Sequence, residues 1–115
     1  MMPSFFVLAL TASACGPSDE FEEAICPEEG TDLTYENFGK TFMDRHCQYC
    51  HGSWVEERRG APGAYTFDDH DSIIDQAEHI YNRSAGDNTS MPPGPDDPDV
   101  EERDMLAEWL ACGAP

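Results

Sequence analysis

Residues 47–51 read Cys-Gln-Tyr-Cys-His, the Cys-x-x-Cys-His pattern that marks the attachment point of a c-type haem. Two thiols separated by two residues can form thioether bonds to the two vinyl groups of one haem. The histidine that follows directly is placed to bind the iron as its proximal ligand. The pattern therefore predicts one covalently attached haem c per chain, with Cys47 and Cys50 as its attachment points and His51 as an axial ligand.

Three other interpretations of Cys47 and Cys50 stay open at this point. A thioredoxin-like redox pair belongs in a βαβ context, and no such pattern surrounds these cysteines. A zinc site needs a second pair of ligands at a suitable spacing, and neither Cys-x-x-Cys nor a matching pair of histidines follows. Disulfide bonds to other cysteines would suit an exported domain. The features further along the chain favour haem.

The composition is that of one small, strongly acidic domain. The chain has 115 residues, five of them cysteines, and cysteines at this density indicate export into an oxidising compartment. The net charge is −18, because 24 acidic residues face only six basic ones. Such a surface repels nucleic acid and favours a basic partner with salt-sensitive association rates. For most of these acids, solubility alone is the simpler interpretation.

The first residues have the pattern of a lipoprotein signal peptide. Residues 1–14 carry no charge, and their apolar run at 5–10 is too short to span a bilayer. Small residues at 12–14 then precede Cys15, an arrangement that resembles a bacterial lipobox. We expect a signal peptide over 1–14, a lipid anchor at Cys15 and a location on the periplasmic side of a bacterial membrane. An ordinary cleaved signal with an incidental cysteine is the alternative.

An acidic tether is expected over residues 15–32, and a helical domain over residues 33–115. Thr34 can cap a first helix that runs to about His46, with apolar residues at helical spacing. Residues 65–67 suggest a short extended piece. A second helix begins at Asp69 or Asp71 and reaches residue 81. The last helix begins with Asp99 and ends at residue 113, which is glycine.

The loop at residues 84–98 offers a second iron ligand. It is rich in glycine and proline, and Met91 lies in it directly before two prolines that would stiffen the chain. A methionine thioether is a soft, neutral ligand that raises the reduction potential of a haem when it is paired with histidine. His46, His70 and His79 are the rival ligands, and we interpret them as surface residues or as neighbours of the site.

These features together resemble the class I cytochrome c family. They comprise a helix ending in the Cys-x-x-Cys-His motif, a Gly-Ala-Pro loop, a middle helix, a Met-Pro-Pro loop and a last helix containing Trp-Leu. The resemblance covers residues 33–115 and implies an all-α fold, the small cytochrome c fold of three main helices and long loops around one haem. It also implies axial ligation by His51 and Met91, with the Pro62 carbonyl accepting a hydrogen bond from His51 Nδ1.

The resemblance further implies contacts between the two ends of the domain. In the family the first and last helices cross, so we expect Gly39 to allow their close approach and Met43 to pack near Trp109. This crossing places the chain before the first helix near the end of the domain. It therefore implies a disulfide between Cys26 and Cys112.

The function expected from this resemblance is electron transfer by a mono-haem cytochrome rather than enzymatic catalysis, because no side chains are set at acid–base spacing. The partner is a basic redox protein or a larger respiratory complex. Arg58 and Arg59 follow the motif closely enough to pair with the haem propionates. The alternative function is that of a haem peroxidase or a gas-binding haem protein, which applies if Met91 is not a stable ligand.

The lipoprotein hypothesis predicts a lipid-modified Cys15 at the mature N-terminus of the exported protein. Mass spectrometry of the membrane fraction measures this directly. An unmodified Cys15 on a soluble mature protein would contradict the hypothesis.

Overall fold

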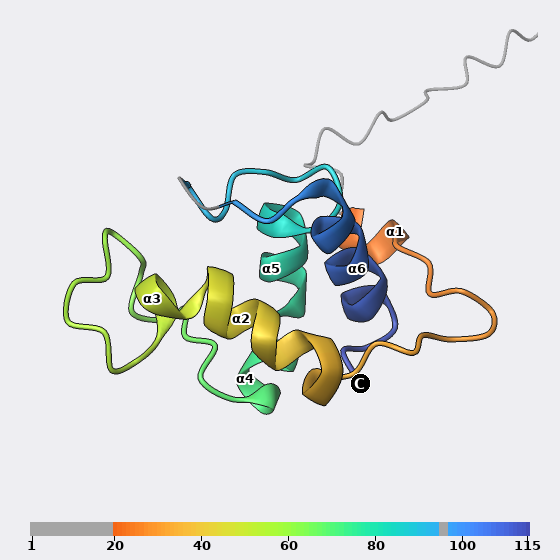
Figure 1. Cartoon of the computed structure of the whole chain (residues 1–115), viewed down its shortest axis with the longest axis horizontal. Helices are drawn as coiled ribbons and strands as arrows, with labels where there is room; N and C mark the ends of the chain where they lie inside the picture. Colours follow the sequence, from red (N-terminus) through yellow and green to blue (C-terminus); the bar gives the residue numbers. More distant parts are fainter. Residues whose placement is uncertain (1–19, 95–96) are drawn as a thin grey trace, which may run out of the picture.

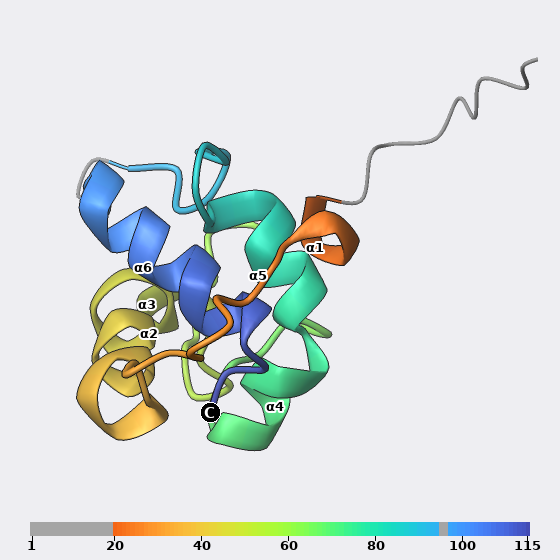
Figure 2. The same cartoon turned by 90° about the vertical axis from the view of Figure 1, so that its right-hand side faces the viewer.

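Helices make up all of the regular structure in the part of the chain that the computed structural model describes, residues 20–94 and 97–115 (Figures 1 and 2). The elements are α1 (Glu20–Glu23), the π-helix η1 (Tyr35–Gly39), α2 (Lys40–His46), α3 (Gln48–His51), α4 (His70–Asp75), α5 (Ala77–Ser84) and α6 (Val100–Ala111). The predicted all-α fold is confirmed. Among these helices, none combines the length and the apolar character needed to cross a membrane. Cys15 and the expected signal peptide lie outside the described residues.

The predicted first helix is present as η1 followed without interruption by α2. Thr34 caps it: its Oγ1 accepts a hydrogen bond from the Asn37 N–H at 3.1 Å, and Asn37 Oδ1 accepts one from the Thr34 N–H at 2.7 Å. Each of these bonds satisfies a backbone donor that the start of a helix leaves without a partner. Phe42 and Met43 are buried, so the apolar face found in the sequence is the face that packs inward. The helix delivers Cys47 at its end.

The predicted second helix is broken into α4 and α5, and the prediction of one continuous helix was wrong. Asp69 caps α4 as expected, accepting a hydrogen bond from the Ser72 N–H at 2.8 Å. Gln76 then leaves the helical conformation with φ −111° and ψ 17°. Its side-chain amide donates to the Thr66 carbonyl at 2.9 Å, which ties the break to the preceding segment. Ile74, two residues before the break, is 42% exposed.

The last helix, α6, supplies the centre of the core. Asp99 caps it by accepting a hydrogen bond from the Glu102 N–H at 2.8 Å, and Gly113 follows its end with φ +90°. Trp109 and its neighbour Leu110 have almost no exposed surface. Val100, the first residue of α6, is 74% exposed.

The first and last helical segments cross in close contact, as the resemblance implied. A Cβ atom added to Gly39 would lie 2.4 Å from the Trp109 indole, so only glycine allows the backbone to come this close. The Phe38 and Trp109 rings meet edge to face, with their centroids 5.9 Å apart. Pro115 completes the contact, since its carbonyl accepts hydrogen bonds from the Tyr35 N–H at 2.7 Å and the Trp109 Nε1–H at 3.1 Å.

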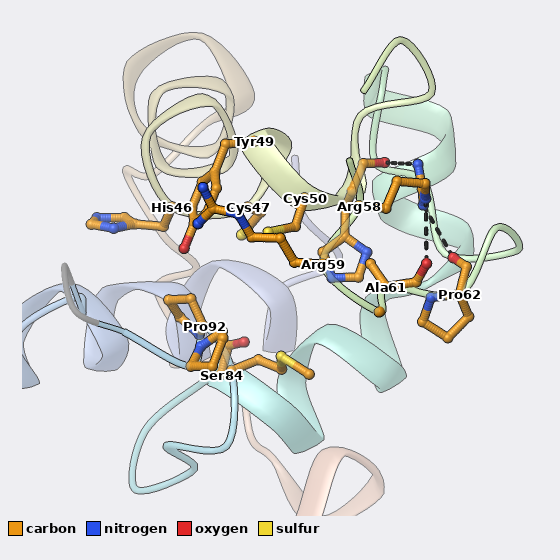
Figure 3. A pocket seen from close by; sticks show the side chains of 14 residues that line it. His46, Cys47, Tyr49, Cys50, Arg58, Arg59, Ala61, Pro62, Ser84 and Pro92 are labelled. Carbon is orange, nitrogen blue, oxygen red and sulfur yellow. Dashed lines mark hydrogen bonds between the residues drawn. The ribbon is translucent and has the colours of Figure 1, made fainter. Parts of the chain in front are cut away.

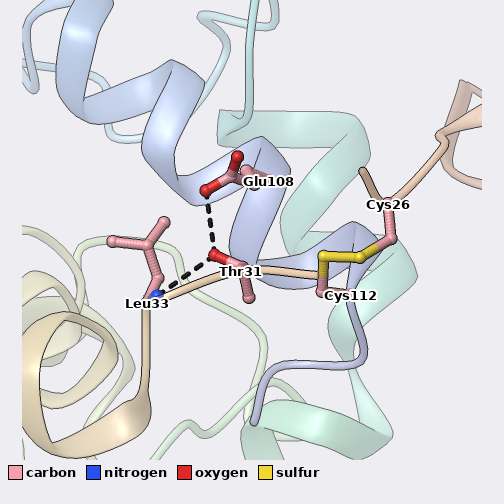
Figure 4. Close-up of a disulfide and its surroundings, with 5 residues drawn as sticks. All are labelled: Cys26, Thr31, Leu33, Glu108 and Cys112. Carbon is pink, nitrogen blue, oxygen red and sulfur yellow. Dashed lines mark hydrogen bonds between the residues drawn. A yellow bond between two sulfur atoms is a disulfide. The ribbon is translucent and has the colours of Figure 1, made fainter. Parts of the chain in front are cut away.

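The segment expected as a tether is packed on the domain from residue 20 onward. In α1, the Phe21 ring contacts the Tyr81 ring of α5, with centroids 5.5 Å apart. Cys26 and Cys112 form a disulfide with their Cα atoms 4.8 Å apart (Figure 4). Nearby, Thr31 Oγ1 donates to a carboxylate oxygen of α6 at 2.8 Å. A covalent bond and ring packing therefore hold this segment against α5 and α6.

The contact between Gly39 and Trp109 predicts that Gly39→Ala destabilises the haem-loaded protein. Replacing glycine by alanine inside a helix ordinarily stabilises by about 0.5–1 kcal/mol. Overpacking a rigid core costs about 1–3 kcal/mol, which outweighs that gain. We expect the free energy of unfolding, measured with denaturant, to fall by about 1–2 kcal/mol. Gly63→Ala is the control, because a Cβ there meets nothing within 4 Å. Equal stability of the two variants would contradict the proposed clash.

Candidate functional site

A cavity of about 120 Å³ lies between the motif at residues 47–51, the loop that follows α3 and the loop between α5 and α6. Cys47, Cys50 and His51 line it together with Met91, which comes from a distant part of the sequence. Figure 3 shows Pro92, next to Met91, across the cavity from Cys50. The fold therefore brings both predicted attachment cysteines and both predicted axial ligands to the lining of one cavity.

The two motif cysteines are free thiols in the described part of the chain, Cys47 buried and Cys50 half-buried. Burial raises the pKa of the Cys47 thiol to about 12, although the nearby Arg103 guanidinium acts in the opposite direction. The disulfide interpretation loses both other cysteines of the described residues as partners, because Cys26 and Cys112 are bonded to each other. Within residues 20–94 and 97–115 no cluster of three or more His, Cys, Asp or Glu could hold a metal ion, so the zinc interpretation gains no support.

The His51 ring is oriented by a backbone carbonyl, but the acceptor is Tyr65 rather than Pro62. His51 Nδ1 lies 2.7 Å from the Tyr65 carbonyl oxygen. The predicted Pro62 carbonyl points elsewhere, because it accepts hydrogen bonds from the Tyr65 N–H at 3.1 Å and from Arg58 Nη2 at 3.1 Å. With Nδ1 donating to Tyr65, Nε2 is the nitrogen available to a metal, and the carbonyl raises its basicity.

The segment that supplies this carbonyl, residues 65–67, is held by side chains that the sequence analysis did not single out. The side-chain amide of Gln48 donates to the Phe67 carbonyl, and that of Gln76 donates to the Thr66 carbonyl at 2.9 Å. Gln48 lies inside the Cys-x-x-Cys-His motif, where the pattern leaves its position free. No local signal in the sequence marked either glutamine, since their acceptors are distant backbone atoms.

Arg58 stabilises the loop that connects the motif to residues 65–67. Its guanidinium donates to the carbonyls of Pro62 at 3.1 Å and Ala61 at 3.3 Å (Figure 3), and to that of Gly52 at 2.8 Å. These bonds satisfy loop carbonyls that no helix supplies with donors. The hypothesis that Arg58 pairs with a haem propionate is not supported, because its donors already have acceptors. Arg59 is exposed, and its guanidinium lies 5.3 Å from the centre of the Tyr49 ring.

The rival histidines have other partners. His70 Nε2 lies 2.6 Å from the Ala114 carbonyl oxygen, away from the cavity. The His79 ring stacks on Tyr65 with centroids 4.0 Å apart, and burial is the main reason that its pKa is below the ordinary value. His46 does line the cavity and is buried, but its Nε2 lies 2.7 Å from Glu102 Oε2. The geometry therefore favours Met91 over these three as a second ligand.

A family model described as cytochrome C oxidase, cbb3-type, subunit III matches residues 37–110 of the chain. The match covers more than half of the sequence and includes the whole motif at residues 47–51 together with Met91. No curated protein and no solved structure matches significantly.

Removal of the Arg58 guanidinium is expected to loosen the loop beside the motif. Hydrogen bonds from a charged donor contribute about 1.5–3 kcal/mol each, less where water competes. We expect Arg58→Met to lower the free energy of unfolding of the haem-loaded protein by about 1–3 kcal/mol. Arg59→Met is the matched control, because it removes the same charge from an exposed neighbour. If both variants unfold at the same denaturant concentration, the hydrogen bonds of Arg58 do not stabilise the loop.

Proposed function

Because the chain belongs to the family described as cytochrome c oxidase, cbb3-type, subunit III, we propose that it carries single electrons on a haem ligated by His51 and Met91. Membership makes it a c-type cytochrome, a haem-based electron-transfer protein with covalently bound haem c. The observation that carries the ligand proposal is the cavity in which Cys47, Cys50, His51 and Met91 meet. The haem supplies a reversible one-electron couple at this site.

The proximal side of the proposed site depends on the motif and on Tyr65. Thioether bonds at Cys47 and Cys50 would keep the His51 ring beside the iron in both oxidation states. The Tyr65 carbonyl, 2.7 Å from Nδ1, restrains the rotation of that ring and increases electron donation from Nε2. A ring held in this way moves little when the iron changes charge, which favours rapid electron exchange.

On the distal side, Met91 is the proposed sixth ligand. Its N–H donates to the Arg83 carbonyl at 2.9 Å, and its own carbonyl accepts a hydrogen bond at 2.9 Å from Arg103. Pro92 and Pro93 follow and restrict the backbone further. A neutral thioether opposite an imidazole stabilises the ferrous state and raises the reduction potential. With His51 and Met91 both bound to the iron, no open position would remain for peroxide or a gas.

The proposed partner is a basic redox protein. A net charge of −18 favours docking to a positive surface and makes the association rate fall as salt is added. From the family description we further propose that the partner is a cbb3-type oxidase or a similar respiratory complex. This domain would be a subunit of that complex or its electron donor. We further propose that the domain works on the periplasmic side of a bacterial membrane, with residues 1–14 as the signal peptide and lipidated Cys15 as the anchor.

The ligand proposal predicts the spectra of the full chain co-expressed with a haem-maturation system. We expect low-spin spectra, a far-red band from methionine bound to ferric iron, and no shift when CO is added to the ferrous protein. Met91→Ala should lose the far-red band, become high-spin, bind CO and show a lower reduction potential. Met105→Leu is the matched control, because Met105 is a partly buried methionine of α6 that does not line the cavity.

Two results would contradict the proposed ligation by Met91. A wild-type protein that is high-spin or binds CO rapidly would remove Met91 as a stable ligand. Peroxidase or gas-binding function would then take first place. A Met91→Ala spectrum identical to that of the wild type would assign the sixth position to another residue.

A further inference from the structure

Arg103 is a buried charge that reaches from α6 to the loop carrying Met91. It lies in the first turns of the helix, and only 4% of its surface is exposed. Its Nη1 donates to the carbonyls of Ser84 at 2.8 Å, Asn88 at 2.9 Å and Met91 at 2.9 Å. One terminal nitrogen therefore donates hydrogen bonds to three backbone carbonyls between residues 84 and 91. We call residues 84–91 the Met91 loop.

The Met91 loop is fixed to two helices by this arrangement. The Met91 N–H donates to the Arg83 carbonyl of α5 at 2.9 Å, while the Met91 carbonyl is held by Arg103 of α6. The Arg103 backbone adds a further link, since its carbonyl accepts a hydrogen bond from the Gly86 N–H at 2.9 Å. With both polar groups of its backbone held, Met91 keeps its Cα in one place. The position of its sulfur then depends on side-chain torsions alone.

The charge of Arg103 is not neutralised inside the described part of the molecule. No carboxylate among residues 20–94 and 97–115 lies within 4.0 Å of its guanidinium. The guanidinium is hydrogen-bonded to backbone carbonyls instead. A charge buried in this way acts over a longer range than one at the surface, because the protein interior screens it weakly.

We propose that Arg103 is a positioning residue for Met91 and that its buried charge raises the reduction potential of the site. The first part rests on the proposed function, in which Met91 is an axial ligand. The second does not, because ferric haem carries one positive charge more than ferrous haem. A nearby cation therefore favours the reduced state whatever the sixth ligand is.

Three variants of the full haem-loaded chain separate these effects. Arg103→Met keeps most of the side-chain volume but removes both the charge and the donors. Arg103→Lys keeps the charge and loses the planar fork. Arg83→Met, the matched control, removes a positive charge from an exposed side chain of α5 and leaves the backbone carbonyl that holds Met91. The readouts are the far-red band, CO binding by the ferrous protein, the reduction potential and the thermal unfolding midpoint.

For Arg103→Met we expect a lower potential, a weaker far-red band and a CO-binding fraction about tenfold larger, the change that corresponds to losing one hydrogen bond to a charged donor. Arg103→Lys should keep a potential near that of the wild type while the far-red band weakens. Arg83→Met should match the wild type in the far-red band and in CO binding, with a smaller change in potential than Arg103→Met, because water screens its charge.

Several results would overturn the proposal. A wild-type far-red band and CO response in Arg103→Met would remove the positioning role, and an unchanged potential would remove the charge effect. If Arg103→Met does not fold, Arg103→Lys decides the positioning role, and wild-type spectra in that variant would exclude it. Loss of thermal stability with both spectrum and potential unchanged would make Arg103 a structural residue only. Failure of the proposed ligation is seen separately, as CO binding by the wild type itself.

Discussion

The contact between the Trp109 indole and the backbone of Gly39 determines how the two ends of the domain meet. Because a Cβ at residue 39 would lie 2.4 Å from the indole, only glycine lets the indole lie against the backbone there. The first helical segment then delivers the motif at its end, while Arg103 and Glu102 of α6 bond Met91 and His46, which line the cavity. The positions of both walls of the cavity depend on this one crossing.

Around that crossing, long polar side chains replace the hydrogen bonding that a sheet or longer helices would provide. Arg58 satisfies the loop after the motif, Gln48 and Gln76 hold residues 65–67, and Arg103 holds the Met91 loop. Buried carbonyls in loops need such donors, since leaving them without partners costs free energy. The same bonds orient both proposed axial ligands, one through the Tyr65 carbonyl and one through the backbone of the methionine. Loop stability and ligand geometry are therefore supplied by the same few residues.

Local patterns allowed several features to be predicted correctly. Thr34 and Asp99 begin helices because their side chains bond backbone N–H groups a few residues ahead, an interaction contained within four residues of sequence. The errors all concern distant partners. The break at Gln76 comes with its bond to Thr66, and the acceptor for His51 changed from Pro62 because a turn redirected that carbonyl.

The sequence by itself determined the chemistry of this protein. The motif, together with the features that follow it, predicted haem c, and helical spacing predicted an all-α domain, because thioether attachment and helix periodicity are local properties. The family match agrees with both. Only the tertiary structure decided which carbonyl orients His51, which side chain holds Met91, and where a buried charge lies relative to the site. Those relations join atoms far apart in the chain, and they exist only after the packing of α6 against the first helix has brought them together.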